Sequence, residues 1–381
     1  MKIGIVCYPT YGGSGVVATE LGKALAQEGH QIHFITYSQP TRLDYFSENL
    51  FYHEVSVKNY PLFEYPPYEL ALASKMVDVV QHESLDLLHV HYAIPHASAA
   101  YLAKQILATR GVNIPFITTL HGTDITLVGK ESTYEPVVTF SINQSDAVTA
   151  VSEDLKNDTL SHFEVTKEIH VIPNFIDLGK FSRQKKEHFK KAICPNGEKL
   201  LVHTSNFRKV KRVQDVIAVF NKVRQVVPTK LLMVGDGPER TAAEEMCRQE
   251  CACDDIRFLG KLEQVEEVLS VSDLFYMTSE KESFGLAALE AMACEVPVIS
   301  TNAGGLPELN KHGSSGFLCE VGDIEDMAEK SIHILDDANL SRFKAGALAR
   351  AKEFEISEIL PQYENLYHKV LEKSNASVTS I

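Results

Sequence analysis

The chain alternates between short apolar runs and longer amphipathic segments. The apolar runs that predict buried strands lie at residues 2–7, 31–36, 85–91, 115–120, 147–151 and 169–172, and again at 200–204, 230–235, 256–259, 274–277 and 296–300. Segments between them, such as 16–28, have apolar residues at helical spacing. Strands that alternate with helices are typical of parallel sheets. The pattern therefore predicts an α/β protein.

The runs fall into two successive blocks. The first block ends at Pro173-Asn174, and the second begins at residue 200. Residues 177–199 are rich in lysine and polar side chains, which is typical of a surface connector. We therefore expect two doubly wound, Rossmann-like domains, an N-terminal one over 1–174 and a C-terminal one over 175–355. The amphipathic segment within 356–381 predicts a helix that packs back on the N-terminal domain.

Composition narrows the classes of partner. The chain has 381 residues, of which 44% are hydrophobic and 23% charged, and a formal net charge of −14. This negative charge argues against nucleic acid and anionic membranes as partners. Uninterrupted apolar stretches of about 18 residues are missing, and the first residues show no signal-peptide pattern. We expect a cytoplasmic protein that holds any anionic ligand with a local basic cluster.

The cysteines and histidines do not form a recognisable metal motif. The seven cysteines are odd in number and lie mostly in apolar segments, so reduced thiols are expected. Cys247, Cys251 and Cys253 lie in or near a charged helix. The pair His89-Val-His91 has no third ligand at a diagnostic spacing. The sequence therefore predicts neither disulfides nor a bound metal.

Polar residues follow several of the predicted strands. In the first block they are residues 89–92 and 121–124, and in the second block residues 205–212 and 235–238. Open parallel sheets bind ligands beyond the carboxyl ends of their strands. Two such sheets that face one another would place these residues in an interdomain cleft. We expect the ligands to bind there.

The loop Gly12-Gly-Ser-Gly15 follows the first strand, where a dinucleotide-binding fold has its phosphate turn. It lacks the G-x-G-x-x-G spacing, and residues 37–40 after the second strand contain no acidic residue for a ribose. An NAD-dependent enzyme is therefore disfavoured. The glycines are expected to present backbone N–H groups to a small anionic ligand.

Two carboxylates, Glu282 and Glu290, bracket Gly285 at a predicted junction between a loop and a helix. If the helix begins near residue 284, its rise separates the carboxylates by roughly 12 Å. The free amides of the first turn would lie between them and form an anion site. A phosphorylated sugar fits this arrangement. The alternative is a helix-capping Glu282 and a solvated Glu290.

Taken in order along the chain, these motifs resemble the retaining glycosyltransferases of family four, which have the GT-B fold. The resemblance covers nearly the whole chain and rests on residues 12–15, 121–124, 173–177, Arg208 with Lys211, 235–238, 282–290 and 303–308. Residues 8–15 and 91–96 are similar to the members that join N-acetylglucosamine to L-malate in the first step of bacillithiol synthesis. The resemblance thus implies UDP-N-acetylglucosamine and L-malate as substrates.

The resemblance also implies four catalytic residues. Arg208 and Lys211 match the pair that neutralises the donor diphosphate, and Glu282 matches a residue that holds a donor-sugar hydroxyl. His121 matches a histidine near the sugar C6 hydroxyl and the reaction centre. Further donor-binding residues implied in the same way are Gly15, Asn206, Leu259, Gly260, Lys261, Phe284, Gly285, Leu286, Ala287 and Glu290. Arg212 departs from the family, because many relatives have glycine there, which leaves the roles within the basic cluster open.

The acceptor is expected on the N-terminal domain, near Gly13, Ser14, Tyr92, Thr118, His121 and Thr123. The resemblance favours front-face attack by the acceptor hydroxyl, without a metal or cofactor. Three alternatives stay open at this point, namely another small acceptor, a UDP-sugar epimerase and a catalytically silent UDP-sugar-binding protein. The sequence does not decide whether the chain forms a homo-oligomer.

Overall fold

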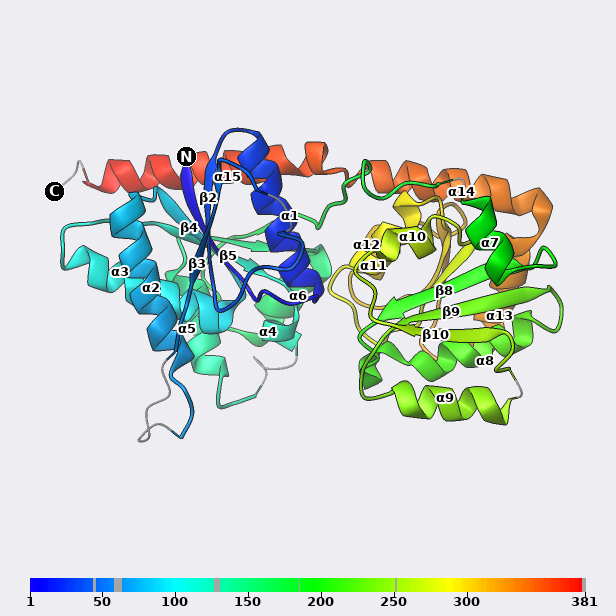
Figure 1. Cartoon of the computed structure of the whole chain (residues 1–381). Helices are drawn as coiled ribbons and strands as arrows, with labels where there is room; N and C mark the ends of the chain where they lie inside the picture. Colours follow the sequence, from blue (N-terminus) through cyan, green and yellow to red (C-terminus); the bar gives the residue numbers. More distant parts are fainter. Residues whose placement is uncertain (44–45, 58–63, 127–130, 185, 251, 379–381) are drawn as a thin grey trace. The chain divides into compact units, whose positions relative to one another are not determined.

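The structure is a computed structural model that describes residues 1–43, 46–57, 64–126, 131–184, 186–250 and 252–378. The chain divides into two compact units (Figure 1). Unit 1 consists of Met1–Asn174 together with Ile356–Ile381, and unit 2 consists of Phe175–Glu355. Each unit is described by itself below.

Unit 1 is built on a parallel sheet with the strand order β3-β2-β1-β4-β5-β6-β7. The strands are β1 (Lys2–Val6), β2 (Gln31–Thr36), β3 (Leu50–Glu54), β4 (Leu87–His91), β5 (Phe116–Leu120), β6 (Ala147–Ala150) and β7 (Ile169–Val171). The order runs outward from β1 in one direction and from β4 in the other. The position between β1 and β4, where the strand order reverses, is the switch point of the sheet. In open parallel sheets, ligands bind at the switch point, beyond the carboxyl ends of the two central strands.

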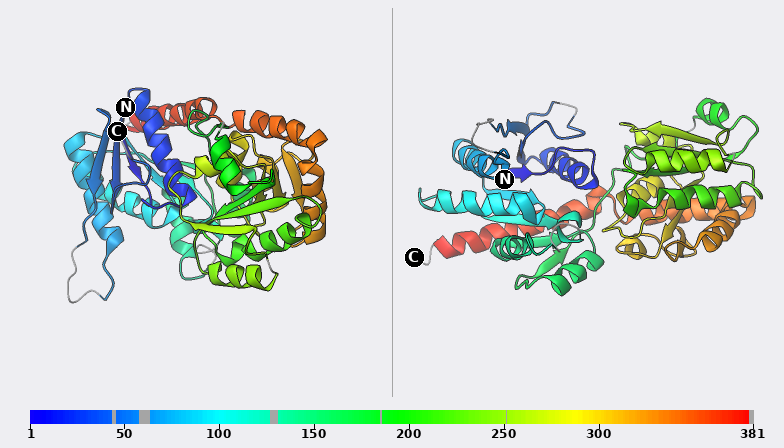
Figure 2. Two further views of the ribbon diagram at one scale, coloured as in Figure 1. Left: turned by 45° about the vertical axis from the view of Figure 1, so that its right-hand side comes forward. Right: turned by 90° about the horizontal axis from the view of Figure 1, so that it is seen from below.

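Helices cover both faces of this sheet, as the two views in Figure 2 show. They are α1 (Gly13–Gln27), α2 (Tyr68–Glu83), a π-helical turn η1 (Ala93–Ala97), α3 (Ser98–Ala108), α4 (Thr123–Thr126), α5 (Glu135–Gln144), α6 (Glu153–His162) and α15 (Ile356–Val378). Leu88 and Val90 of β4 pack in one core with α2 and α3. His89, which points to the opposite face, contacts Tyr367 of α15. The last helix is therefore part of the core of unit 1.

Unit 2 repeats the architecture with the strand order β10-β9-β8-β11-β12-β13. Its strands are β8 (Lys199–Ser205), β9 (Thr229–Gly235), β10 (Ile256–Gly260), β11 (Leu274–Met277), β12 (Val298–Thr301) and β13 (Gly316–Cys319). Its helices are α7 (Glu187–Ile193), a 3-10 turn η2 (Lys209–Lys211), α8 (Val213–Val223), α9 (Arg240–Gln249), α10 (Val265–Leu269), α11 (Leu286–Ala293), α12 (Leu306–Leu309), α13 (Ile324–Leu335) and α14 (Asp337–Lys352). The switch point here lies between β8 and β11. Within the described part of the chain, no helix combines the length and the apolar character needed to cross a membrane.

The two α/β sheets confirm the fold class expected from the sequence, with three differences in detail. Strands β3 and β13 were not predicted, because β3 is largely exposed and the two middle residues of β13 are only partly buried. The helix after Glu282 begins at Leu286 and not near residue 284, so the helical estimate of the Glu282–Glu290 separation does not hold. The expected connector contains the helix α7.

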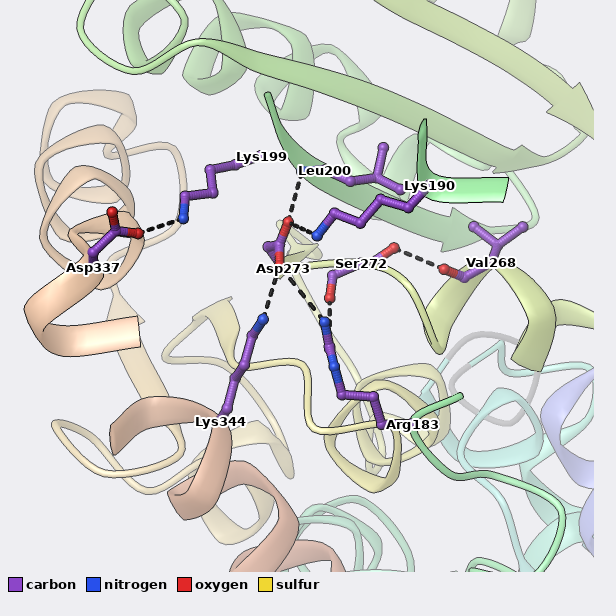
Figure 3. Close-up of polar contacts among 9 residues, drawn as sticks. All are labelled: Arg183, Lys190, Lys199, Leu200, Val268, Ser272, Asp273, Asp337 and Lys344. Atoms are coloured by element: carbon purple, nitrogen blue, oxygen red, sulfur yellow. Dashed lines mark hydrogen bonds and ion pairs between the residues drawn. The ribbon is translucent and has the colours of Figure 1, made fainter. Parts of the chain in front are cut away.

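A buried carboxylate, Asp273, organises the core of unit 2 (Figure 3). Its oxygens accept hydrogen bonds from Lys190 Nζ at 2.6 Å, Lys344 Nζ at 2.8 Å and the Leu200 amide at 3.0 Å, and Arg183 lies 3.8 Å away. Burial raises the pKa of Asp273, but Lys344 and Lys190 outweigh burial and hold this pKa below its usual value. Asp273 thus ties α7, β8 and α14 together.

The six cysteines within the described residues are free thiols, in agreement with the expectation, and Cys251 lies outside those residues. Cys247 and Cys253 have their sulfur atoms 3.4 Å apart at the end of α9.

Candidate functional site

The switch point of unit 1 brings three of the expected acceptor residues together. Ser14 lies in the first turn of α1, after β1, whereas Tyr92 follows β4 and His121 follows β5. The hydroxyl of Tyr92 donates a hydrogen bond to Ser14 Oγ at 2.9 Å. The rings of Tyr92 and His121 have centroids 5.4 Å apart. A hydroxyl pair and an imidazole therefore meet at the carboxyl edge of the sheet.

The glycine loop supplies an amide-rich helix start, but not every glycine faces a ligand. Val16 N donates the first helical hydrogen bond to Gly12 O, so the amides of residues 13–15 precede the helical bonding pattern. A Cβ atom on Gly15 would lie 2.4 Å from the carbonyl oxygen of Tyr8. Gly15 is therefore needed because the preceding loop passes close to the helix. The sequence predicted a different reason, namely that the glycines present N–H groups to a ligand.

A row of buried histidines lies behind this group. His91 Nδ1 is 2.8 Å from His121 Nε2, and the rings of His89 and His91 stack at 4.5 Å. His89 contacts the hydroxyls of Tyr367 at 2.8 Å and Thr119 at 2.7 Å. His89 is thus a structural residue with both ring nitrogens satisfied, while His91 fixes the orientation of His121.

These histidines are neutral at physiological pH. Burial lowers the pKa of His121 to about 3, with a further contribution from His96. Burial also lowers the pKa of His91 well below its ordinary value. A neutral imidazole can exchange hydrogen bonds with a sugar hydroxyl. It does not supply a positive charge.

We expect the His121 ring to stay neutral between pH 5 and 8, because its lowered pKa of about 3 lies below this window. Long-range 1H–15N NMR of the histidine rings checks this result, and the His82 ring, which lies exposed on α2, serves as the internal reference. An imidazolium signal from His121 near pH 6 would contradict the structure.

The remaining residues of the acceptor set are placed differently. Thr123 is exposed at the start of α4. Asp124, its neighbour, is buried and accepts hydrogen bonds from the amides of Ala93 at 2.9 Å and Gly122 at 3.0 Å. Thr118 is fully buried, and its hydroxyl lies 2.7 Å from that of Ser145 inside the unit. The structure therefore does not bring Thr118 to the group around Tyr92.

Burial raises the pKa of Asp124 to about 6, although its backbone hydrogen bonds oppose the shift. This carboxyl therefore titrates in the pH range where the buried histidines do not. Its two oxygens are engaged by the loop amides, so Asp124 holds the loop after β5 in position.

In unit 2, the switch point brings together the basic cluster and Glu282. Arg208 is exposed in extended backbone after β8, and Lys211 follows at the end of η2. Lys211 Nζ forms an ion pair with Glu282 Oε1, which also accepts a hydrogen bond from Ser279 Oγ at 2.8 Å. Glu282 comes from the loop after β11. Two predicted catalytic residues that are 71 positions apart thus contact one another.

Backbone contacts join these two loops. Glu280 N donates to Val210 O at 2.8 Å, and the hydroxyl of Thr278 donates to Lys211 O at 2.9 Å. Arg212 has φ 47°, in the left-handed region that favours glycine. Its guanidinium bonds Asp215 and Glu280 at 2.6 and 3.0 Å. Arg212 thus stabilises the loop, and its side chain is committed to these carboxylates.

Helix α11 starts at Leu286, which lies between Glu282 and Glu290 along the chain. Gly285 has φ 99°, in the left-handed region that favours glycine, so the backbone conformation at this point requires glycine. Ala288 N makes the first helical bond, to Gly285 O, which places the amides of Leu286 and Ala287 ahead of it. Glu290 is 7% exposed, so its interpretation as a solvated surface residue is wrong.

Other predicted donor residues lie on the same unit. Leu259, Gly260 and Lys261 form the end of β10 and the residue after it, and Gly260 has φ 68°. Asn206 is exposed two residues before Arg208. Phe284 is buried and packs edge to face on Phe354 at 5.5 Å, so its ring supports the loop from inside.

His203 is a buried residue of β8 that was not predicted as part of the site. Its Nδ1 is 2.9 Å from Tyr276 O and its Nε2 is 2.8 Å from Ser205 Oγ. Burial lowers the pKa of His203 to about 4. A histidine near a strand end was the only available signal. Gly235 also supports this loop, since a Cβ there would lie 1.8 Å from Ser205 O.

Comparison with known proteins agrees with this arrangement. Residues 11–180 match the family model Glycosyltransferase Family 4, and residues 184–349 match the model Glycosyl transferases group 1. A curated relative, N-acetyl-alpha-D-glucosaminyl L-malate synthase of Bacillus anthracis, is 50% identical over 375 residues, which cover 97% of each chain. A glycosyltransferase of Methanocaldococcus jannaschii, described as uncharacterized, is 26% identical and covers 83% of this chain and 84% of its own.

Solved structures share the fold. Anabaena Alr3699/HepE in complex with UDP and glucose superimposes with a TM-score of 0.80 at 20% identity, over 96% of this chain and 99% of that one. The chain belongs to the family-four glycosyltransferases with the GT-B fold, and it is a glycosyltransferase. The expected resemblance to an N-acetyl-alpha-D-glucosaminyl L-malate synthase is confirmed.

Proposed function

We propose that the protein transfers N-acetylglucosamine from UDP-N-acetylglucosamine to the hydroxyl of L-malate, with retention of the anomeric configuration. The products are N-acetyl-alpha-D-glucosaminyl L-malate and UDP, which would make this the first step of bacillithiol synthesis. The observation that carries the substrates is the 50% identity, over nearly the full length, to a synthase named for this product.

The geometry of unit 2 supports a nucleotide-sugar donor. Arg208 is exposed beside Lys211, and the amides at the start of α11 form a second source of positive potential. A leaving UDP gains negative charge as the glycosidic bond breaks, so fixed donors at the diphosphate lower the barrier. Glu282, held by Lys211 and Ser279, is oriented to accept a hydrogen bond from a sugar hydroxyl.

The geometry of unit 1 supports a small anionic acceptor. The amides of residues 13–15 and the hydroxyls of Ser14 and Tyr92 are donors suited to the two carboxylates of malate. His121 is neutral and lies against Tyr92, so it can hold a hydroxyl without repelling a cation from the donor side.

The hydrogen-bond partners of the Asp124 and Glu282 carboxylates favour front-face attack over a covalent intermediate. A double displacement needs a carboxylate nucleophile under the anomeric carbon. Asp124 is engaged by the amides of Ala93 and Gly122, and Glu282 by Lys211 and Ser279. In the proposed reaction the malate hydroxyl attacks beside the departing UDP, and a phosphate oxygen takes its proton. The enzyme contributes position and charge.

The test is to mix the purified protein with UDP-N-acetylglucosamine and L-malate in a chelating buffer and to search for the glycosyl malate by mass spectrometry. Formation of this product supports the proposal. A new sugar nucleotide formed without malate would show an epimerase, and binding of the donor without UDP release on addition of malate would show a silent binding protein. Transfer that returns only when a divalent metal is restored would contradict the metal-independent mechanism.

Replacing Ser14 by alanine is expected to raise the KM for malate about 10-fold while the affinity for UDP stays unchanged. The reason is that Ser14 loses a hydrogen bond to a charged group, and such bonds contribute roughly 1.5–3 kcal/mol. Steady-state kinetics and calorimetry of UDP binding measure the two quantities. Ser161→Ala, on the exposed end of α6, is the matched control. Equal losses in malate and UDP binding would refute the assignment of Ser14 to the acceptor.

A further inference from the structure

His33 is a buried histidine of β2 that the proposed transfer does not use. Its side chain is 1% exposed, and its Nδ1 lies 3.0 Å from Nε2 of His53 on β3. Its other nitrogen, Nε2, is buried and has no hydrogen-bond partner among the residues that the structure describes. Nδ1 is therefore the nitrogen of His33 that faces another polar side chain.

A carboxylate completes a group of three metal-binding side chains. Glu83 is the last residue of α2, and it is half-buried, as is His53. One ring nitrogen of each histidine and one carboxylate oxygen of Glu83 all lie within 4.8 Å of one another. Two imidazoles and one carboxylate are a donor set that Zn²⁺ accepts, with water in the fourth position.

The fold explains why these residues meet. Strands β2 and β3 pair in parallel with Ile35 opposite His53, so His33 and His53 point to the same face of the sheet. Ile35 packs in the core that contains the α2 side chains, which shows that α2 covers this face. The C-terminal end of α2 then delivers Glu83 to the two rings.

The spacing of the donor atoms suits a tetrahedral zinc ion. Zinc–nitrogen bonds of about 2.0–2.1 Å place two ligand atoms about 3.3 Å apart. His33 Nδ1 and His53 Nε2 are 3.0 Å apart, and all three donor atoms lie within 4.8 Å of one another. The two rings must turn toward a common point, and the Glu83 carboxylate must move by up to about 1.5 Å, to hold the ion. Metal binding requires that the proton shared between these nitrogens moves to the far nitrogen of one ring, and no net proton is released.

Both rings are in the protonation state that metal binding requires. Burial lowers the pKa of His33 to about 4, with a contribution from His53, and burial lowers the pKa of His53 as well. Two neutral imidazoles therefore face one another at neutral pH. Two cations act on these rings: Lys2 donates its Nζ to the backbone oxygen of Glu83 at 2.9 Å, and Lys75 lies 3.5 Å from the carboxylate of Asp78.

We propose that His33, His53 and Glu83 bind one Zn²⁺ ion. The ion would join β2, the edge strand β3 and the end of α2, so its role is to fix the edge of the sheet. Glu83 lies on the side where β1 begins, as its contact with Lys2 shows, whereas the candidate acceptor residues follow the carboxyl ends of β1, β4 and β5. The zinc site is therefore separate from the glycosyl-transfer chemistry.

A spacing motif could not have revealed this site. Its members are 20 residues (53 − 33) and 30 residues (83 − 53) apart and come from three different elements. The sequence has no short metal-ligand spacing, so it predicts no bound metal. The proposed zinc ion changes the expectation that no metal is bound, but the proposed transfer reaction stays independent of metal.

The first experiment uses the full-length, metal-free protein. Zinc is titrated in competition with a chromogenic chelator, and 15N-histidine NMR is recorded before and after one equivalent. We expect one zinc ion per chain, with the ring shifts of His33 and His53 changed and those of His89, His91 and His121 unchanged. Failure to compete with the chelator, or shifts confined to other histidines, would overturn the proposal without bearing on transfer to malate.

The second experiment compares variants. His53→Gln and Glu83→Gln change half-buried side chains and are expected to weaken zinc binding about 100-fold, in line with the effect of losing a group that supports a metal site. His82→Gln is the matched control, because His82 is the exposed neighbour of Glu83 and bonds Asp78. Unchanged zinc affinity in both test variants, or an equal loss in His82→Gln, would overturn the proposal. Circular dichroism verifies that each variant is folded. If a variant does not fold, the NMR experiment on the unaltered chain tests the zinc proposal by itself.

Discussion

Replacing Arg208 by alanine is expected to lower kcat for glycosyl transfer by about 100- to 1000-fold, the effect of removing one fixed donor at a developing charge. Arg208 is exposed and precedes Lys211, the partner of Glu282, by three residues in the loop where the proposed diphosphate would bind. Release of UDP in the presence of malate measures the rate. The loss should appear mainly in kcat, because the charge on UDP is greatest in the transition state and product.

Lys209→Ala is the control for this experiment. Lys209 is exposed, adjacent in sequence and of the same charge, but the resemblance gives it no role at the donor. Its replacement should leave kcat nearly unchanged. If both variants lost activity to the same extent, the effect of Arg208 would be one of general positive potential, and its assignment to the diphosphate would be wrong.

The second large effect concerns stability. Asp273→Asn is expected to destabilise unit 2 by about 3 kcal/mol, because it leaves Lys190, Lys344 and Arg183 around a buried site without their carboxylate. The side chains of the three cations are 17–31% exposed. Solvent therefore reduces the loss of stability to the lower end of the roughly 3–5 kcal/mol that follows the breaking of a buried ion pair. The melting temperature of unit 2 should fall by roughly 6–12 °C. Calorimetry measures the shift.

Two controls define this prediction. Asp337→Asn removes an ion pair to Lys199 in which the carboxylate side chain is 90% exposed, and it should have little effect. The pH dependence gives an independent check. The pKa of Asp273 is lowered in the folded state, so its contribution is present above the unfolded pKa of about 3.9 and is lost as pH falls through the folded value. The two proteins should therefore converge in stability on acidification; a constant difference would contradict the assignment.

The sheets could be predicted because their strands are buried on both faces and appear in the sequence as continuous apolar runs. Strand β4 is an example, since every residue from Leu87 to His91 is buried. Strand β3 could not be found in this way, because it lies at the edge and Phe51 and Tyr52 are exposed. The cleft between the two domains stays a prediction.

The polar residues of the candidate site could be located at strand ends, but their partners could not. The pairing of Lys211 with Glu282 depends on β8 and β11 being neighbours, which is a property of strand order and not of sequence spacing. Thr118 was expected at the site because of its position in the sequence, but its side chain lies elsewhere. It is only three residues from His121 along the chain, yet the alternation of side chains in β5 directs it to Ser145.

The last helix, α15, has a consequence for how the chain acquires its structure during synthesis. Tyr363 and Tyr367 are fully buried in unit 1, where Tyr367 contacts His89, yet they follow the whole of unit 2 in sequence. A ribosome makes the chain from its N-terminus, so residues 175–355 are complete before these tyrosines exist. The C-terminal unit can therefore finish folding while the N-terminal unit still exposes the face that receives α15, and the first unit to be made is the last to close.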